Sequence, residues 1–303
     1  FTNNTFKNVP AGLNENNKFS TSDYRDVANT GPFVEPDAAV ELAQAAEASG
    51  CESIWTVEHV VVPAGYESQY PYAKDGKMPG GSEDFDIPDP LIWLSYIAAA
   101  TDQIRLATGV MIMPQRNPLV TAKAVATLDR LSKGRMILGV GSGWLEEEFD
   151  ALGISFNDRG DRTDEYLEVM KEAWGSDTAS YEGKFISFDN VYSRPQPVSR
   201  HVPIIVGGHS KRAARRAGEL GDGFFPGRGH PEELAALFDH ARQCAEQSGR
   251  DPDALEFTAG GPTTPDYVEQ LADLGVTRMI VPPMDPAQFA KFGDEVISQF
   301  SDA

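Results

Sequence analysis

The sequence predicts an α/β protein of the (β/α)8 class, a TIM barrel, on three observations. From Lys18 onward, short β-like runs alternate with longer amphipathic segments, which is the pattern of a parallel sheet crossed by helices. Between Ile104 and Trp144, two short apolar strands flank one helical segment, and the second strand leaves through a glycine-rich turn. The length of 303 residues suits a single barrel, which typically takes about 250 residues or more.

Eight short β-like runs are the predicted strands of this barrel. Helix-like segments join most of them, so we expect the strands to run parallel. In chain order they span 18–22, 52–57, 104–109, 135–140, 203–208, 222–226, 255–260 and 278–283.

The segments between the strands carry the start and stop signals of helices. In the segment 35–50, Pro36 suits the first helical turn, Gly50 suits the C-terminal cap, and regularly spaced apolar residues form one face. Other helical segments end on a glycine in the same way, at 211–221, 231–249 and 264–275.

Two insertions interrupt the regular spacing: one after strand 2, at 61–90, and one before strand 5, at 176–201. The first follows a strand on the catalytic face, which makes it a candidate substrate lid; a surface loop fastened by its tyrosines Tyr66, Tyr70 and Tyr72 is the equal alternative. The second contains a hairpin-like pattern. We expect residues 1–17 to be disordered or extended and residues 18–303 to form one domain.

Composition excludes several classes of partner. A net charge of −20 argues against nucleic acid and against an anionic membrane surface. The longest apolar run, 91–100, is too short to span a bilayer, and the N-terminal residues lack the pattern of a secretory signal. With only two cysteines and no metal-ligand spacing among the histidines, the sequence predicts a cytoplasmic protein without a metal site.

Glu58 and His59 follow the second predicted strand, where the catalytic residues of a barrel emerge. An imidazole at this place is able to donate a hydrogen bond or move a proton near neutral pH. A histidine held by a neighbour for structural reasons is the alternative.

Glycines mark three further candidate positions. Gly109 lies inside a strand, where glycine indicates a bulge or a close approach to the backbone, with packing as the alternative reason. Gly141 and Gly143 belong to a G-x-G-x-G run at the end of the fourth strand, which is not the dinucleotide fingerprint. In 206–218, a strand passes through two glycines into a helix start with Ser210 and Lys211, which forms either an anion cradle or a capped turn.

Taken together, these motifs resemble the luciferase-like monooxygenase superfamily, and more narrowly its branch of coenzyme F420-dependent oxidoreductases. The resemblance covers about residues 18–282. The blocks that carry it are WTVEHVVVP, IRLATGVMIMPQRNPLVTAKAVATLDRLSKGRMILGVGSGWLEEEF, RGDRTDEYLEVMKEAW and VPIIVGGHSKRAARRAGELGDGFF.

The resemblance implies a deazaflavin or flavin across the carboxyl ends of the strands. It places His59 near the reactive edge of the ring, with Glu58 as its acidic neighbour, and it implies a cis peptide bond between Gly109 and Val110 in a bulge that supports the ring. The residues that it implies for cofactor binding are Thr108, Gly109, Val110, Gly141, Gly143, Gly207, Gly208, His209 and Ser210.

One position departs from the family pattern. Where some sugar-phosphate dehydrogenases of the family carry a proton-donating glutamate after the strand-four glycines, this chain has Trp144. We therefore expect Trp144 to wall an apolar substrate pocket, with Glu147 or Glu146 as an alternative acid.

The function predicted on this basis is hydride transfer between coenzyme F420 and a small organic substrate. The closest rival is an FMN-dependent monooxygenase that uses oxygen and a separate reductase. A rival of another class is a non-catalytic flavin-binding barrel. A cationic groove for the longer tail of coenzyme F420 would favour the deazaflavin; its candidate residues are Arg116, Lys211, Arg212 and Arg215. By analogy with relatives, we expect a homodimer.

Overall fold

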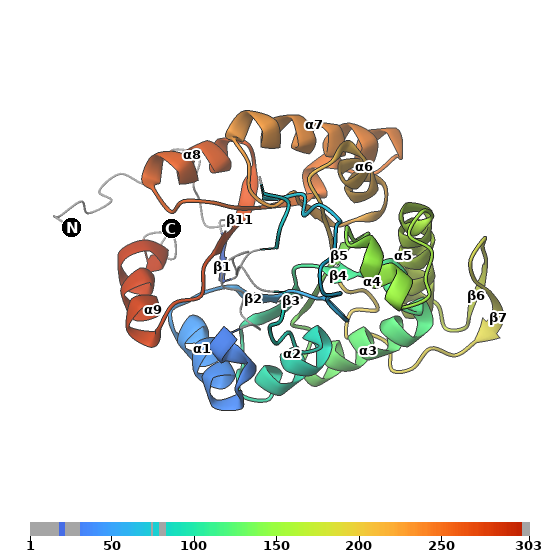
Figure 1. Cartoon of the computed structure of the whole chain (residues 1–303), viewed down its shortest axis with the longest axis horizontal. Helices are drawn as coiled ribbons and strands as arrows, with labels where there is room; N and C mark the ends of the chain where they lie inside the picture. The colour runs from blue at the N-terminus through green and yellow to red at the C-terminus, as the bar shows by residue number, and fades with distance from the viewer. Residues whose placement is uncertain (1–17, 22–30, 74, 79–82, 299–303) are drawn as a thin grey trace.

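The computed structural model describes residues 18–21, 31–73, 75–78 and 83–298, and these form a closed parallel barrel inside a ring of helices (Figure 1). Each strand pairs in parallel with its neighbours, and the last strand pairs with the first, so the sheet closes on itself. The barrel predicted from the sequence is therefore confirmed. Residues 1–17, for which a disordered or extended segment is predicted, lie outside the described residues.

The barrel strands lie close to the predicted runs. They are β1 (Lys18–Thr21), β2 (Ser53–Thr56), β3 (Arg105–Thr108), β4 (Met111–Ile112), β5 (Met136–Gly141), β8 (Ile204–Gly207), β9 (Gly223–Phe225), β10 (Glu256–Gly260) and β11 (Val276–Val281). The last strand ends at Val281, two residues before the predicted end at 283, because Pro282 and Pro283 have no N–H for the sheet.

Helices follow the strands and surround the barrel. The α-helices are α1 (Pro36–Ala48), α2 (Pro90–Ala98), α3 (Pro118–Leu131), α4 (Glu146–Ala151), α5 (Arg159–Gly175), α6 (Lys211–Leu220), α7 (Pro231–Gln247), α8 (Pro265–Asp273) and α9 (Pro286–Phe292). Short 3-10 turns lie at Gly31–Val34, Met113–Gln115 and Pro252–Ala254, and a π-helical turn lies at Gly293–Ile297. Gly50 follows the end of α1 with φ of 85°, the left-handed conformation that suits its predicted role as a stop signal.

The third barrel strand is split into β3 and β4 at Gly109 and Val110. The peptide bond between these two residues is cis, as the family resemblance implies. Both halves pair with β5, so the strand continues on the far side of the irregularity.

The barrel interior is filled by side chains. Its central layer consists of Trp55, Ala107, Ile137, Ile205, Phe225 and Ile280, all of which are buried. Beneath this layer, at the amino ends of the strands, the fully buried guanidinium of Arg278 pairs with Glu52 and Glu256 and lies 5.8 Å from the Trp55 ring. The packed floor leaves the carboxyl ends of the strands as the place for a ligand.

The predicted hairpin pattern corresponds to a two-stranded antiparallel sheet of β6 (Ala179–Glu182) and β7 (Ser187–Val191). Figure 1 shows this hairpin standing outside the ring of helices. Its tip is fastened to α5, because the Glu165 carboxylate accepts hydrogen bonds from the backbone N–H groups of Lys184, Phe185 and Ile186 at 2.8–2.9 Å.

Candidate active site

His59 lies beyond the carboxyl end of β2 and forms a hydrogen-bonded pair with a residue of α4. Its Nδ1 atom lies 2.9 Å from Oε2 of Glu148, and the side chains are 12% and 2% exposed. The sequence pattern predicts a functional role for His59 but does not indicate Glu148. The only signal for Glu148 was its place in a run of three glutamates after the glycine-rich turn.

The Glu148 carboxylate is held by several donors besides His59. Its Oε1 accepts hydrogen bonds from the backbone N–H groups of Val60, at 2.6 Å, and Val61, at 3.3 Å. Burial opposes its ionisation, but His59, Gln115 and the Val60 N–H outweigh this effect and hold the pKa of Glu148 below its ordinary value. Glu148 is therefore ionised near neutral pH.

Glu58, which the resemblance placed beside His59 as a catalytic residue, is buried in a different set of contacts. Arg116 donates to Glu58 from Nε at 2.8 Å and also contacts Asp89 at 2.9 Å. The backbone N–H of Ile112 donates to Glu58 at 2.6 Å. Burial disfavours the charge on Arg116, yet Glu58 and Asp89 raise its pKa. Glu58 thus ties the end of β2 to β4 and α3.

Trp144 packs against the insertion that follows β2. Its ring makes edge-to-face contacts with His59 at 5.8 Å, Tyr66 at 5.5 Å and Tyr70 at 5.2 Å between centroids. Tyr66 and Tyr70 are buried in a small cluster with Met78 and Leu145. The described part of the insertion is therefore docked beside His59 by its tyrosines. We call residues 61–73 of this insertion the flap.

Glu147, the neighbour of Glu148 on α4, fastens the flap. Its Oε1 accepts hydrogen bonds from the N–H groups of Glu67 at 2.7 Å and Ser68 at 3.0 Å. Although burial acts in the opposite direction, these hydrogen bonds and those of the Ser68 side chain and its own N–H lower the pKa of Glu147 to about 2. Glu147 is therefore ionised near neutral pH and is not a ready proton donor.

Two predicted cofactor-binding glycines make room for the Val110 side chain. A β-carbon on Gly141 would lie 2.7 Å from Val110 Cγ2, and one on Gly207 would lie 2.6 Å from Val110 Cγ1. Thr108 is also engaged within the fold, since its hydroxyl donates to the Gly139 carbonyl at 2.7 Å. These residues lie at the carboxyl ends of β3, β5 and β8, where they form the floor of the candidate site.

The turn after β8 continues directly into α6. Gly208 has φ of 127°, a conformation that other residues adopt with strain. His209 Nδ1 lies 3.1 Å from the Pro226 carbonyl, and the Ser210 hydroxyl accepts from the Ala213 N–H at 3.2 Å as a helix cap. The predicted helix start is confirmed, and the Ser210 oxygen already has a protein partner.

Cations gather beside this turn, but not all of those predicted. Arg116 is paired with Glu58 and Asp89, and Arg215 is paired with Asp164 and Glu219. Lys211 and Arg212 are exposed in the first turn of α6. Arg159, which the sequence patterns do not indicate, donates to the Gly143 carbonyl at 3.2 Å. Burial lowers the pKa of Arg159; the charge of Glu146 opposes this effect, and the charge of Arg212 adds to it.

Gly143, another predicted cofactor-binding residue, has φ of 81° and faces Phe149 and Ile112. Its carbonyl group links the glycine-rich turn to Arg159 at the start of α5. This turn therefore connects the cation cluster of Arg159, Lys211 and Arg212 with α4, which carries Glu147 and Glu148.

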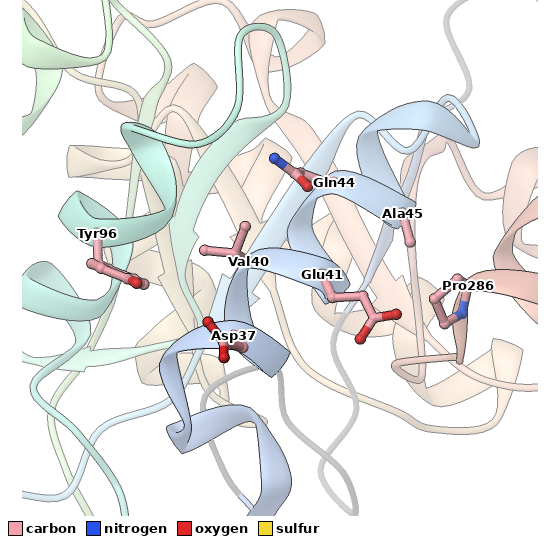
Figure 2. A pocket seen from close by; sticks show the side chains of 7 residues that line it. All are labelled: Asp37, Val40, Glu41, Gln44, Ala45, Tyr96 and Pro286. Atoms are coloured by element: carbon pink, nitrogen blue, oxygen red, sulfur yellow. The ribbon is translucent and has the colours of Figure 1, made fainter.

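An open pocket elsewhere on the molecule has a volume of about 630 Å³ and contains none of the predicted site residues. Figure 2 shows it on the outer helices, lined mainly by α1 together with Tyr96 of α2 and Pro286 of α9. Its charged lining residues are Asp37 and Glu41, which would repel an anionic cofactor.

Over residues 18–21, 31–73, 75–78 and 83–298, no three His, Cys, Asp or Glu side chains are arranged to hold a metal ion. Within the same ranges, no helix has the length and apolar character that crossing a bilayer requires.

A closed parallel barrel that gathers a histidine–carboxylate pair and a cationic helix start at the carboxyl ends of its strands defines a (β/α)8 enzyme. Within this class, the chain belongs to the luciferase-like monooxygenase family, whose model matches residues 18–296. The match begins at the first residue of β1 and includes every site residue described above.

Related proteins include both dehydrogenases and monooxygenases. An uncharacterised protein of Mycobacterium tuberculosis is 32% identical over 80% of this chain and 83% of its own length. An F420-dependent glucose-6-phosphate dehydrogenase of Kineococcus radiotolerans is 30% identical over 74% of this chain and 62% of its own. An FMNH2-dependent dimethylsulfone monooxygenase of Pseudomonas fluorescens is 29% identical over 68% of this chain and 52% of its own length.

Solved structures share the fold at lower sequence identity. An F420-dependent secondary alcohol dehydrogenase, in complex with an F420–acetone adduct, superposes with a TM-score of 0.74 at 18% identity and covers 93% of this chain and 98% of its own. This similarity supports the barrel architecture.

Proposed function

We propose that this chain is a coenzyme F420-dependent oxidoreductase that transfers a hydride to or from a small, partly apolar organic substrate. The observation that carries the proposal is the cation cluster of Arg159, Lys211 and Arg212, which stands out in a chain of net charge −20. FMN ends in one phosphate, whereas coenzyme F420 continues into an oligoglutamate tail. Three cations exceed what one phosphate requires and suit the longer anion.

The residues at the strand ends fit such a cofactor. Val110, wedged between Gly141 and Gly207, provides an apolar floor, and the start of α6 provides the positive end of a helix and the exposed cations Lys211 and Arg212 for a phosphate. Bound coenzyme F420 would supply the centre that accepts or delivers the hydride. His59 would hydrogen-bond to the substrate or the ring, and Trp144 would wall the substrate pocket.

The structure suggests different roles for two other candidate residues. We propose that Glu58 positions β4 through Ile112 and Arg116. We propose that Glu147 holds the flap, since its carboxylate accepts two N–H groups of that segment. His59 and Glu148 then remain as the pair that handles protons.

The second candidate function is an FMN-dependent monooxygenase. The sequence similarity to the FMNH2-dependent enzyme of Pseudomonas fluorescens favours it. This function would require oxygen and a separate flavin reductase as partner.

Parallel fluorescence titrations of the purified protein with coenzyme F420 and FMN, each oxidised and reduced, test the proposal. We expect micromolar or tighter binding of coenzyme F420 and weaker binding of FMN. A preference for reduced FMN would support the monooxygenase. Tight binding of either cofactor with no substrate turnover would support a non-catalytic flavin-binding barrel, and binding of neither would overturn all three functions.

Variants sharpen this titration. The double change Lys211→Gln and Arg212→Gln should weaken coenzyme F420 by about tenfold or more and FMN by less, since only the former has the longer anionic tail. Lys291→Gln on α9 removes an exposed charge away from the site and serves as the control. If the double variant loses the same affinity for both cofactors, Lys211 and Arg212 bind only the phosphate that the two cofactors share.

We also infer that the protein acts in the cytoplasm as a homodimer. Both cysteines, Cys51 and Cys244, are free and buried, which suits a reducing compartment. Large apolar side chains are exposed on neighbouring helices, at Ile92 of α2 and at Val120 and Leu131 of α3. Sedimentation should show a dimer that Ile92→Glu dissociates; a monomeric wild type would contradict the inference.

A further inference from the structure

The His59–Glu148 pair contains a chemical asymmetry. An ionised carboxylate has only acceptor atoms, so the hydrogen in the 2.9 Å contact between His59 and Glu148 must be on Nδ1 of the imidazole. A neutral imidazole carries one N–H, and its Nε2 atom then bears a lone pair. The two nitrogens of His59 therefore have different roles.

We propose that Glu148 is a positioning residue that fixes His59 as the Nδ1–H tautomer and leaves Nε2 as a proton acceptor in the site. The role of this acceptor in turnover rests on the proposed function, but the tautomer is a property of the chain without any ligand. In water, free histidine side chains favour the opposite tautomer, so the protein must select this one.

The carboxylate can make this selection because it is itself immobilised. Glu148 is 2% exposed, and the Val60 and Val61 N–H groups fix its Oε1 atom, which leaves Oε2 for His59. The buried amide of Gln115 lies beside Glu148 and contributes to its low pKa, although neither amide atom completes a hydrogen bond of standard geometry with the described residues. These neighbours keep Glu148 charged and acceptor-only.

The ring orientation is also restricted. The edge of His59 contacts Trp144 with an interplanar angle of 87°, and only 12% of the His59 side chain is exposed. Nε2 makes no hydrogen bond to any residue in the described part of the chain. A substrate group next to Nε2 must therefore be a hydrogen-bond donor, such as a hydroxyl or an N–H group.

A second histidine–carboxylate pair in the same chain serves as an internal control for the tautomer of His59. His201 pairs with Asp222 through its other nitrogen, with Nε2 lying 2.9 Å from Oδ2. The same reasoning assigns His201 as the Nε2–H tautomer. The two pairs should give opposite signatures in one spectrum.

Two-dimensional 1H–15N NMR of the 15N-histidine-labelled protein, without cofactor, reports the tautomer of each of its five histidines. The spectrum is recorded at about pH 8.5, roughly two units above the pKa of a free histidine side chain in water. The His59 and His201 signals are assigned by their loss in His59→Gln and His201→Gln. We expect the Nδ1–H pattern for His59 and the Nε2–H pattern for His201.

A His59 spectrum of the Nε2–H form, of a doubly protonated ring or of a tautomer mixture in the wild type would overturn the proposal. In Glu148→Gln, whose amide is able to donate as well as accept, we expect His59 to shift toward Nε2–H, while His201 stays unchanged. A persistent Nδ1–H form in a folded Glu148→Gln protein would also count against Glu148 as the selecting residue. Since the wild-type spectrum requires no cofactor, its outcome is independent of the titrations that test the proposed function.

Discussion

The two ends of the barrel contain similar groups in different states of pairing. At the amino ends of the strands, Arg278 is fully buried between Glu52 and Glu256. At the carboxyl ends, His59 has one nitrogen bound to Glu148, and its other nitrogen has no hydrogen-bond partner among the described residues. The lower end satisfies its charges internally, whereas the upper end keeps polar atoms available.

A histidine–carboxylate pair occurs at each end, which makes the comparison sharper. His201 and Asp222 lie just before β8 and β9. The Asp222 carboxylate, which contacts His201, also accepts a hydrogen bond from the backbone N–H of Ile204. His59 and Glu148 lie after β2 and β5. The same chemistry thus fastens the sheet at the lower end and, under the proposed function, handles protons at the upper end. Position in the barrel, and not residue type, separates the two roles.

We expect the largest effect on stability from loss of the ion cluster at the amino ends of the strands, which consists of Arg278, Glu52 and Glu256. Replacing Arg278 with methionine removes the fully buried cation that Glu52 and Glu256 share, which should lower the free energy of unfolding by about 3–5 kcal/mol. Chemical denaturation measures this change. Arg105→Met, which removes a 26% exposed partner of Glu52 at 3.3 Å, should cost about 1 kcal/mol or less. Equal losses in both variants would mean that burial of Arg278 is unimportant.

The lower end should also determine part of the acid stability. Burial raises the pKa of Glu52, but Arg278 outweighs it and lowers the pKa to about 2. A lowered folded-state pKa stabilises the protein above the unfolded value of about 4.5, and this contribution is lost as the pH falls toward 2. Relative to Glu52→Gln, the wild type should therefore lose about 3 kcal/mol between roughly pH 5 and pH 2. Parallel stability curves for the two proteins would refute the linkage.

The upper end should affect turnover more than stability. With a substrate identified in the coenzyme F420 assay, His59→Gln should lower kcat/KM by about 100-fold or more, as expected for loss of a proton-transfer group. Its free energy of unfolding should fall by only about 1 kcal/mol. His201→Gln is the matched variant at the lower end and should leave kcat/KM unchanged. A full-rate His59→Gln enzyme would remove His59 from the mechanism.

The smallest expected effect concerns the flap. Glu147→Gln weakens the charge-assisted hydrogen bonds to Glu67 and Ser68, so amide exchange in residues 66–70 should quicken by about tenfold, while exchange in the barrel strands stays the same. Hydrogen exchange with mass spectrometry resolves the two regions. Glu146→Gln, an exposed neighbour, serves as the control. If both variants exchange alike, the flap is held by its tyrosines alone.

Local patterns were sufficient to predict most of the fold. The strands are short apolar runs, and the stop signal at Gly50 depends only on the chain near it. His59 was selected because it follows the second predicted strand, where a barrel carries its catalytic residues. The cis bond between Gly109 and Val110, in contrast, came from the family resemblance, since a cis peptide bond has no physical signature in one sequence.

The carboxylates of the site could not be assigned in the same way. Glu146, Glu147 and Glu148 are consecutive and differ only in their rotation about the axis of α4. In the structure, the first is exposed, the second binds the flap and the third is buried against His59. Which glutamate faces which neighbour depends on where α4 begins and how it packs. That information lies in tertiary contacts about 80–90 residues apart in sequence.

The predicted cations show the same limit. Arg116 and Arg215 resemble Lys211 and Arg212 in sequence, but carboxylates from distant helices pair with them. Asp89 precedes α2, and Asp164 lies on α5. Arg159, in contrast, begins α5 and is distant in sequence from the turn after β8. Its place beside Arg212 could therefore not be predicted from the sequence.

The arrangement of α4 has a consequence for any redesign of this protein. One short helix, α4, fastens the flap through Glu147 and orients His59 through Glu148. Access to the site and the orientation of the histidine therefore both depend on the position of α4. Grafting a flap from a relative with another substrate would shift α4 and alter the histidine as well. Changes of specificity should therefore keep the backbone of residues 66–68 and alter side chains alone.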